Sequence, residues 1–352
     1  MKKYFTIYKD IKEKIQSGIY LANGKLPSKR VTADTYGVSV ITVEKAYDML
    51  FEEGYVYSEE RKGYFVCPID ITNTTRTRLN ASSINYVNDD EEVACDFEYS
   101  VWFKTVRKII MEKGEKLFIK SPNKGLGILR NAISDYLYRY RKMVVEPKNI
   151  IIGSGAEQLY ESAVKVLGRD KIYGIENPCY SMISSVYDSL GVKTISLQMG
   201  ESGIKSEELT LKDFNVLHVT PFNSFPSGIT ATASKRHEYL SLMKKRNGFI
   251  IEDDFASEFF KPGNPIDSLY SLSDNSNVIY INTFSKSLSP SMRMGYMILP
   301  DNLLEKYDKI LGEFSCSVPV MEQHVLTEFI NSGNFERHLN KVRRKMQKKT
   351  PN

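Results

Sequence analysis

The sequence predicts an α/β protein with a small helical region at the N-terminus and a larger region built on a mostly parallel sheet. Residues 1–68 read as three helices and a hairpin, and residues 69–92 are rich in Thr, Ser, Asn and Asp without an apolar period. Over 93–352, short apolar runs alternate with amphipathic stretches. This alternation is typical of parallel strands joined by crossover helices. We therefore expect a small domain over 1–68, a linker over 69–92 and a large domain over 93–352.

Length and composition exclude several classes of protein. The chain has 352 residues, of which 41% are hydrophobic and 26% are charged, as in ordinary folded domains. It has no apolar run of about 18 residues, and its N-terminus lacks the apolar core of a secretory signal. Its four cysteines are far apart, which argues against a zinc site or a redox pair. We expect a cytoplasmic protein with no membrane partner and no metal.

The net charge of +5 does not by itself indicate nucleic-acid binding. Six basic residues lie within the last dozen positions, and without them the chain is close to neutral. A prediction of DNA binding must therefore rest on a motif rather than on bulk charge.

The first region carries the signals of a helix-turn-helix. Apolar residues recur every three or four positions over 4–15, which predicts a helix. Ser28 can cap a short second helix and Ser39 a third, with Gly37 between them. Two capped helices joined by a short turn form a helix-turn-helix, whose second helix enters the major groove of DNA. The alternating run GYVYSEERKGYFV over 54–66 predicts a two-stranded wing.

Basic and hydroxyl side chains gather where these helices begin and at the wing tip. Amines, hydroxyls and helix N-termini suit the phosphate oxygens of duplex DNA. The residues expected to contact DNA are Lys29, Arg30, Ser39, Thr42, Lys45, Lys62 and Gly63. The alternative is a small helical module that contacts other proteins.

The run LPSKR, followed by YGVSVITVEKAYDMLFEEGYV and KGYFV, resembles the winged helix-turn-helix of the GntR superfamily across nearly all of 1–66. The resemblance implies a double-stranded DNA operator as the partner. One position departs from it, because the residue after Ser39 is commonly arginine in this family and is Val40 here. A bidentate guanine contact worth about 1–3 kcal/mol is thereby absent, so the operator is expected to differ or to depend more on DNA shape.

In the larger region, reactive side chains follow a predicted strand. The run NVIYINTFSKSLSPSMRMGYMILP places Thr283, Ser285 and Lys286 at a strand end and Arg293 seven residues further on. A lysine can form an imine with a carbonyl, and hydroxyls with an arginine fork are good phosphate ligands. Taken alone, such a loop is more often an ordinary surface loop.

Other strand ends carry side chains that suit the same kind of ligand. A glycine-rich turn before a helix offers N–H groups to a phosphate, and a buried carboxylate can hold a pyridinium nitrogen protonated. A tyrosine can stack on a flat ring, and an asparagine can donate a hydrogen bond. These residues are Ser154, Gly155, Ala156, Asp253, Tyr180 and Asn223. Each has an ordinary structural alternative, but together they predict a pyridoxal 5′-phosphate site.

The chain resembles fold type I aminotransferases, and specifically the MocR-type regulators that fuse such a domain to a GntR-type head. The tract FSKSLSPSMRMGY is the most specific part of this resemblance. It implies a Schiff base at Lys286, with Arg293, Thr283, Ser285 and the Gly155-Ala156 turn on the phosphate. It also implies Asp253 at the pyridine nitrogen and Tyr180 against the ring, with Asn223 as a further cofactor ligand.

Two departures bear on catalysis. The family's E-D-D-Y-D-S-E-F reads EDDFASEF here, so Phe255 replaces a tyrosine that approaches the cofactor's 3′-oxygen. Loss of that hydrogen bond is expected to weaken cofactor binding by about 0.5–1.5 kcal/mol. Family members also continue for about another hundred residues, which carry the arginine that grips a substrate carboxylate. This chain instead ends after a predicted long helix over about 321–347, which resembles a truncation or frameshift.

Three hypotheses follow for function. The first is a dimeric transcriptional regulator that binds operator DNA and senses pyridoxal phosphate or an amine or amino acid bound to it. The second is a working aminotransferase with an accessory head. The third is a truncated DNA-binding product with a defective sensor domain.

Overall fold

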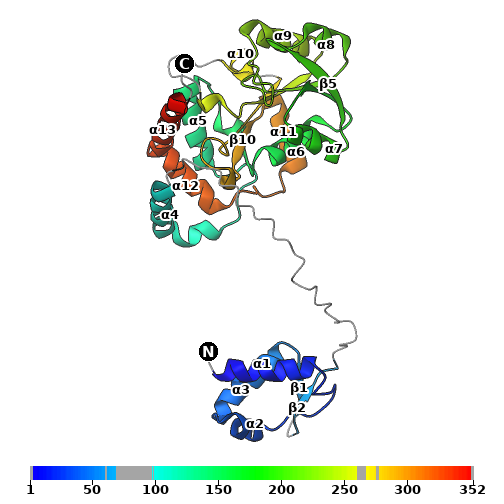
Figure 1. Ribbon diagram of the computed structural model, residues 1–352, viewed down its shortest axis with the longest axis vertical. Helices are drawn as coiled ribbons and strands as arrows, with labels where there is room; N and C mark the ends of the chain where they lie inside the picture. Colours follow the sequence, from blue (N-terminus) through cyan, green and yellow to red (C-terminus); the bar gives the residue numbers. More distant parts are fainter. Residues whose placement is uncertain are drawn as a thin grey trace. The chain divides into compact units, whose positions relative to one another are not determined.

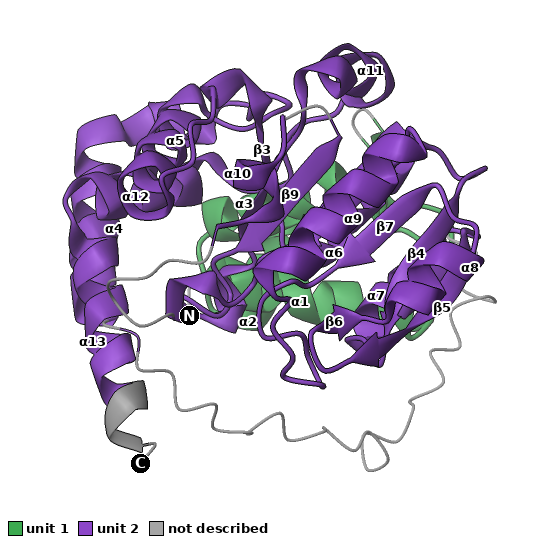
Figure 2. Cartoon of the chain, turned by 90° about the horizontal axis from the view of Figure 1, so that it is seen from above, with its two compact units in different colours: residues 1–92 green, residues 93–352 purple. Residues whose placement is uncertain are grey.

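The chain divides into two units, residues 1–92 and 93–352 (Figures 1 and 2). The computed structural model describes residues 3–59, 62–68, 97, 99–259, 267–274 and 277–349, with side chains to 345. The linker expected over 69–92 lies outside these described residues.

The smaller unit contains three helices and a hairpin in the order that the sequence predicts. The elements are α1 (Lys3–Gln16), α2 (Lys29–Tyr36), α3 (Val40–Glu52), β1 (Val56–Glu59) and β2 (Gly63–Val66). β1 and β2 pair antiparallel, as expected for a wing. One apolar core joins the three helices and includes Ile11, Val43, Tyr47 and Leu50. The helix-turn-helix and wing patterns are therefore confirmed as local structure.

Local capping accounts for where α2 and α3 begin. The Ser28 hydroxyl accepts a hydrogen bond from the backbone N–H of Val31 at 3.3 Å, and the Ser39 hydroxyl accepts one from Thr42 at 3.3 Å. Gly37 ends α2 with a φ of 60°, a left-handed conformation that glycine adopts without strain. These caps set the start of α3, and with it the side chains that α3 presents to solvent.

The described strands of the larger unit form one eight-stranded sheet in the order β3-β10-β9-β8-β7-β4-β5-β6. The central pairs, from β5 through β4, β7 and β8 to β9, are parallel, whereas β10 and β6 pair antiparallel with their neighbours. The strands are β3 (Ile150–Gly153), β4 (Ile172–Asn177), β5 (Lys193–Gly200), β6 (Gly203–Ile204), β7 (Val216–Val219), β8 (Phe249–Asp253), β9 (Val278–Thr283) and β10 (Gly295–Ile298). The prediction of a mostly parallel sheet is confirmed.

Helices cover both faces of the sheet. They are α4 (Tyr99–Lys113), α5 (Gly127–Arg141), α6 (Ala156–Leu167), α7 (Ser181–Ser189), α8 (Ser206–Leu211), α9 (Ala233–Lys245), α10 (Leu269–Leu272), α11 (Asp301–Leu311), α12 (Val320–Asn331) and α13 (Asn334–Lys349). Short 3₁₀ turns are η3 (Gly114–Phe118), η4 (Pro147–Asn149), η5 (Ser257–Phe259) and η6 (Pro290–Met292).

Strand side chains alternate between two apolar cores, as the pleat requires. Ile250 packs in the core that contains residues of α5, α9 and α12, while Ile251 packs with α6, α7 and α11. Asp253 follows the same alternation and lies on the α6 side of β8, where it lines a cavity with residues of α6. The sheet therefore decides which strand-end residues share a site.

One predicted helix is wrong. The pattern over 321–347 predicts a continuous helix, but the structure has α12 and α13 instead. Gly333 separates them with a φ of 71°, and its N–H donates to the carbonyl of Ile330 at 3.0 Å.

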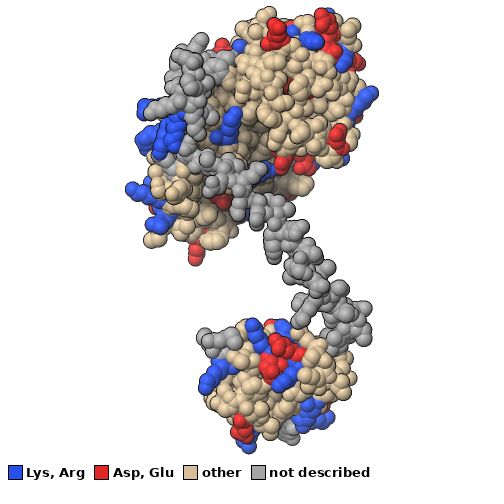
Figure 3. Space-filling view, in the orientation of Figure 1, with Lys and Arg blue, Asp and Glu red and all other residues tan. Residues whose placement is uncertain are grey.

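Lysines and arginines gather on the exposed side of α13, among them Arg337 and Arg344 (Figure 3). Within the described residues, every helix is too short or too polar to cross a membrane.

Candidate functional site

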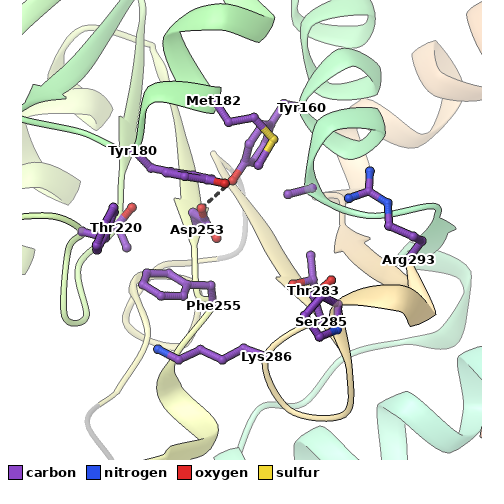
Figure 4. Close-up of a pocket in the computed structure, with 13 residues that line it drawn as sticks. Tyr160, Tyr180, Met182, Thr220, Asp253, Phe255, Thr283, Ser285, Lys286 and Arg293 are labelled. Carbon is purple, nitrogen blue, oxygen red and sulfur yellow. Dashed lines mark hydrogen bonds between the residues drawn. The ribbon is translucent and has the colours of Figure 1, made fainter. Parts of the chain in front are cut away.

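A cavity of about 350 Å³ lies at the carboxyl ends of β8 and β9 (Figure 4). This edge of a parallel sheet is the usual place for a ligand in an open α/β fold. The lining residues are Ala156, Tyr160, Tyr180, Met182, Thr220, Phe225, Asp253, Phe255, Thr283, Ser285, Lys286, Pro290 and Arg293. The volume lies within the range of small-molecule sites.

The cavity brings together most of the cofactor residues that the sequence predicts. Seven of them line it: Ala156, Tyr180, Asp253, Thr283, Ser285, Lys286 and Arg293. Ser154 lies in an adjoining cleft that Arg293 also lines. Asn223 is not among the lining residues, and its backbone N–H donates to the Thr230 hydroxyl at 3.1 Å. Its predicted contact with a cofactor therefore gains no support from the cavity.

Asp253 is the acidic residue of the cavity. It is buried at the end of β8, and the Tyr160 hydroxyl donates a hydrogen bond to its Oδ2 at 2.5 Å (Figure 4). Burial raises the pKa of the Asp253 carboxyl to about 7, while the hydrogen bond from Tyr160 lowers it. Asp253 can therefore hold or release a proton near neutral pH, and Tyr160 favours its charged form.

Lys286 is the amine of the cavity. Its Nζ lies over the ring of Phe255, 4.6 Å from the ring centroid, and 5.5 Å from that of Phe259 (Figure 4). Burial lowers the pKa of Lys286, and the charge of nearby Glu258 raises it. A partly desolvated lysine has more of the neutral amine that attacks a carbonyl.

Arg293 lies at the opposite side of the cavity, beside the start of α6 (Figure 4). Its guanidinium pairs with the carboxylate of Glu157 at 2.6 Å. A Cβ atom at Gly155 would lie 3.4 Å from the Arg293 Cζ, and Gly155 also has a φ of 103°. The Cβ distance is an ordinary contact, so it is the backbone conformation that favours glycine at this turn. The turn lies beside the first N–H groups of α6, where an anion is stabilised.

Sequence reasoning missed several lining residues. Tyr160 lies in the middle of α6, where its position matches the apolar face of that helix, and only the fold brings it to Asp253. Met182, Thr220 and Phe225 come from α7 and from the loop after β7. No local pattern marks them as ligands, although Phe225 also contacts the predicted ring-stacking residue Tyr180, with ring centroids 6.0 Å apart.

The side chains of the cavity fit pyridoxal phosphate. Asp253 keeps acceptor capacity beyond the one hydrogen bond from Tyr160, which suits a protonated pyridine nitrogen. Thr283, Ser285 and Arg293 supply hydroxyl and guanidinium donors for a phosphate. Tyr180 supplies an aromatic face. Among the described residues, no group of three or more histidine, cysteine or acidic side chains is arranged to hold a metal.

In the smaller unit, the predicted DNA-contact residues lie around the starts of α2 and α3. The Lys29 ammonium pairs with Glu44 at 2.5 Å, and the Lys45 ammonium lies over the ring of Tyr4 at 5.1 Å from the centroid. Arg30 is exposed in the first turn of α2. Ser39 and Thr42 share a hydroxyl–hydroxyl hydrogen bond of 2.8 Å at the start of α3.

The remaining two DNA-contact residues lie at the wing. Lys62 precedes β2 and pairs with Glu59 at 2.9 Å, with most of its side chain exposed. Gly63 begins β2 with a φ of 113°, which favours glycine at the tip of the hairpin. The wing tip therefore presents a cation on a tight turn.

Both regions match known families. Residues 91–350 match the family described as aminotransferase class I and II, and residues 3–66 match the bacterial regulatory proteins of the gntR family. The larger unit is therefore an aminotransferase-type domain, whose cofactor is pyridoxal phosphate, and the smaller unit is a GntR-type helix-turn-helix.

Relatives contain both regions in one chain. The uncharacterized HTH-type transcriptional regulator YdeL of Bacillus subtilis is 32% identical over 359 residues, which cover 98% of this chain and 77% of YdeL. The probable rhizopine catabolism regulatory protein MocR of Rhizobium meliloti is 25% identical, over 96% of this chain and 73% of MocR.

Among solved structures, the kynurenine aminotransferase of Pyrococcus horikoshii, determined in complex with PMP, has a similar fold. Its TM-score is 0.65 at 24% identity, over 71% of this chain. The aligned part spans 64% of the length of that enzyme. The chain thus belongs to the MocR-like HTH-type regulators, in which a GntR-type DNA-binding region is joined to an aminotransferase class I and II domain.

Proposed function

We propose that this chain is a cytoplasmic, dimeric regulator that binds operator DNA and whose DNA affinity depends on pyridoxal phosphate at Lys286. The observation that carries the proposal is the cavity of the larger unit, which groups Lys286, Asp253 and Arg293. The winged helix-turn-helix in the same chain supplies the DNA-binding surface.

Each polar residue has a separate task in this proposal. Asp253 would hold the pyridine nitrogen, Arg293 would bind the phosphate and Tyr180 would lie against the ring, and all three line the cavity. When bound, pyridoxal phosphate supplies an aldehyde that condenses with a primary amine and then acts as an electron sink. Lys286 provides that amine, and burial lowers its pKa, which favours the neutral form that condensation needs.

The Arg293 guanidinium is paired with Glu157, so this ion pair must open before Arg293 can bind a phosphate. Both side chains are about half exposed, so the pair contributes little stability and can open at low cost. A phosphate with two negative charges competes well with one carboxylate for the guanidinium. We therefore expect Arg293 to turn from Glu157 to the phosphate when the cofactor binds.

The effector is a small amine or amino acid. A primary amine that enters the cavity would compete with Lys286 for the carbonyl carbon of the cofactor. Such an amine could release Lys286 while the cofactor stays in the cavity. The aromatic rings of Phe255 and Phe225 border the place where such a molecule would lie.

An exposed apolar face supports dimerisation of the larger unit. Tyr99, Phe103 and Ile110 follow one another on one side of α4, and all three are exposed. Phe118 of the adjoining η3 is 90% exposed. Apolar side chains gathered in this way are typical of a surface that another protein covers, and a second copy of the chain is the partner that we propose.

The test is an operator-binding titration. A duplex selected from a randomised library is titrated with the full chain, with and without pyridoxal phosphate, beside a Lys286→Ala variant. We expect the cofactor to change the affinity of the natural chain and to leave that of the variant unchanged. An affinity that ignores the cofactor would contradict the sensing role. Steady conversion of added amino acids with a keto-acid acceptor would instead favour an aminotransferase.

A further inference from the structure

The start of α3 presents apolar side chains to solvent. Val40 is 41% exposed and Ile41 is 76% exposed, although Val43 and Tyr47 of the same helix are fully buried. Two adjacent exposed aliphatic side chains form only a small apolar patch, so what they indicate depends on where they lie. Their place in the first turn of the second helix of a helix-turn-helix is where base edges are contacted.

The surroundings of this pair are polar, and the nearest acidic residue, Glu44, is paired with Lys29 at 2.5 Å. Ser39 and Thr42 flank the pair in the sequence, and their hydroxyls share a hydrogen bond of 2.8 Å at the start of α3. Lys45 follows in the next turn of α3, with its ammonium over the ring of Tyr4. Hydroxyls and an ammonium suit phosphate oxygens rather than an apolar protein surface. Val40 and Ile41 are therefore apolar side chains next to groups that can bind phosphate.

The charge distribution along α3 limits which part of the helix approaches DNA. Asp48 and Glu52 are exposed in its second half, and exposed Glu44 in its second turn is paired with Lys29, whereas its first turn carries no acidic residue. Carboxylates are repelled by the phosphate backbone. The first turn of α3 is thus the part that can lie deepest in a groove, and it carries Val40 and Ile41.

The major groove offers one apolar group to such side chains. The C5-methyl of thymine is the only methyl on the edges of the four ordinary bases, and apolar side chains contact it. We propose that Val40 and Ile41 recognise thymine methyl groups, so that each half of the operator carries thymine opposite the start of α3. This inference rests on the proposed function, since it assumes that the smaller unit binds duplex DNA.

The experiment compares thymine with uracil, which differs only by the missing methyl group. A duplex selected from a randomised library is resynthesised with uracil at one thymine position at a time, and the affinity of the full chain is measured for each. We expect about a threefold to tenfold loss at one or two positions in each half, as for burial of one methyl group, and no loss elsewhere.

Two variants connect the effect to the side chains. Ile41→Ala and Val40→Ala should bind the thymine duplex more weakly and should lose the difference between thymine and uracil at the sensitive position. Phe51→Ala is the matched control, because Phe51 is also apolar and 51% exposed but lies at the far end of α3. It should keep the full difference.

The outcomes separate this inference from the function on which it rests. Tight binding to a selected duplex with no uracil effect at any position would overturn methyl recognition and leave operator binding in place. A uracil effect that persists unchanged in both alanine variants would also overturn it. If the library yields no duplex that the chain binds, the proposed function itself fails, and methyl recognition with it.

Discussion

In the proposed cofactor site, Asp253 carries a negative charge at a position where burial opposes it. Burial raises its pKa to about 7, and the hydrogen bond from Tyr160 acts in the opposite direction. The Tyr160 ring packs edge-on against His218 at 4.9 Å, and the His218 Nδ1 lies 2.6 Å from the Tyr187 hydroxyl. The Tyr160 ring is thus packed in a buried aromatic environment, and Tyr160 is the residue of this group that bonds to the carboxylate.

Removal of that hydroxyl should therefore weaken cofactor binding at neutral pH. Tyr160→Phe deletes only the donor, so the pKa of Asp253 should rise further and less of the carboxyl should be ionised near pH 7. We expect about a tenfold lower affinity for pyridoxal phosphate at neutral pH, as for loss of one hydrogen bond to a charged group. The loss should shrink above pH 8. Cofactor titrations followed by absorbance between pH 6 and 9 measure both effects.

The matched control is Tyr187→Phe, which removes a buried hydroxyl that bonds to His218 rather than to Asp253. It should leave the pH dependence of cofactor affinity close to that of the natural chain. Equal pH profiles for Tyr160→Phe and the natural chain would show that Tyr160 is only a packing residue.

At the scale of elements, helix caps are the features that the sequence reveals most directly. Ser28, Gly37 and Ser39 act within a few residues of their own positions, so their effect on α2 and α3 is readable from the chain. The break between α12 and α13 is not, because one glycine in an amphipathic pattern costs only about 1 kcal/mol and does not specify a turn. Tyr160 is not readable either, since its partner lies 93 positions away.

The cap of α3 has a measurable consequence. Ser39→Ala removes the acceptor for the Thr42 N–H, and we expect it to destabilise the smaller unit by about 1 kcal/mol. Amide hydrogen exchange over residues 40–52 should become faster, and operator affinity should fall with it. Ser39→Asp retains a capping oxygen and should restore the slow exchange. Unchanged exchange in Ser39→Ala would mean that packing alone fixes the start of α3.

At the scale of the whole molecule, buried carboxyls link stability to pH. Burial raises the pKa of Glu176 and Glu252 to about 8, and that of Asp253 and Glu258 to about 7. In the unfolded chain these groups lose their protons near pH 4 to 5. Between pH 6.5 and 8 the folded unit therefore holds protons that the unfolded chain has released, so stability falls as pH rises.

Thermal unfolding of the cofactor-free chain at pH 6.5 and 8.5 checks this direction. The single tryptophan, Trp102, lies in the larger unit, so its fluorescence follows that unit. We expect the midpoint temperature to fall, because each pH unit over which such a carboxyl keeps its extra proton changes stability by about 1.4 kcal/mol. The buried imidazole of His218, with a pKa lowered by burial to about 3, acts in the other direction only below about pH 6.5. A rising midpoint would contradict the burial of these acids.

The apolar face of α4 and η3 determines the expected assembly. Phe118→Asp places a charge within the proposed contact, so a dimer of the natural chain should become a monomer at micromolar concentration. Light scattering during size-exclusion chromatography measures the mass. Leu211→Asp is the control, because Leu211 is 83% exposed on α8 and lies outside the proposed contact. A Phe118→Asp variant that stays dimeric would show that the dimer contact does not include Phe118.

The most direct measurement is the visible absorption spectrum of the purified chain after pyridoxal phosphate is added and the excess is removed. The natural chain should retain an absorption band that Lys286→Ala lacks, since Lys286 is the lysine that lines the cavity and can hold the cofactor covalently there. Retention of the band would establish that the cavity around Lys286 binds the cofactor in this chain. A natural chain that retains no band, or a variant that retains the same band, would contradict the site on which the whole account depends.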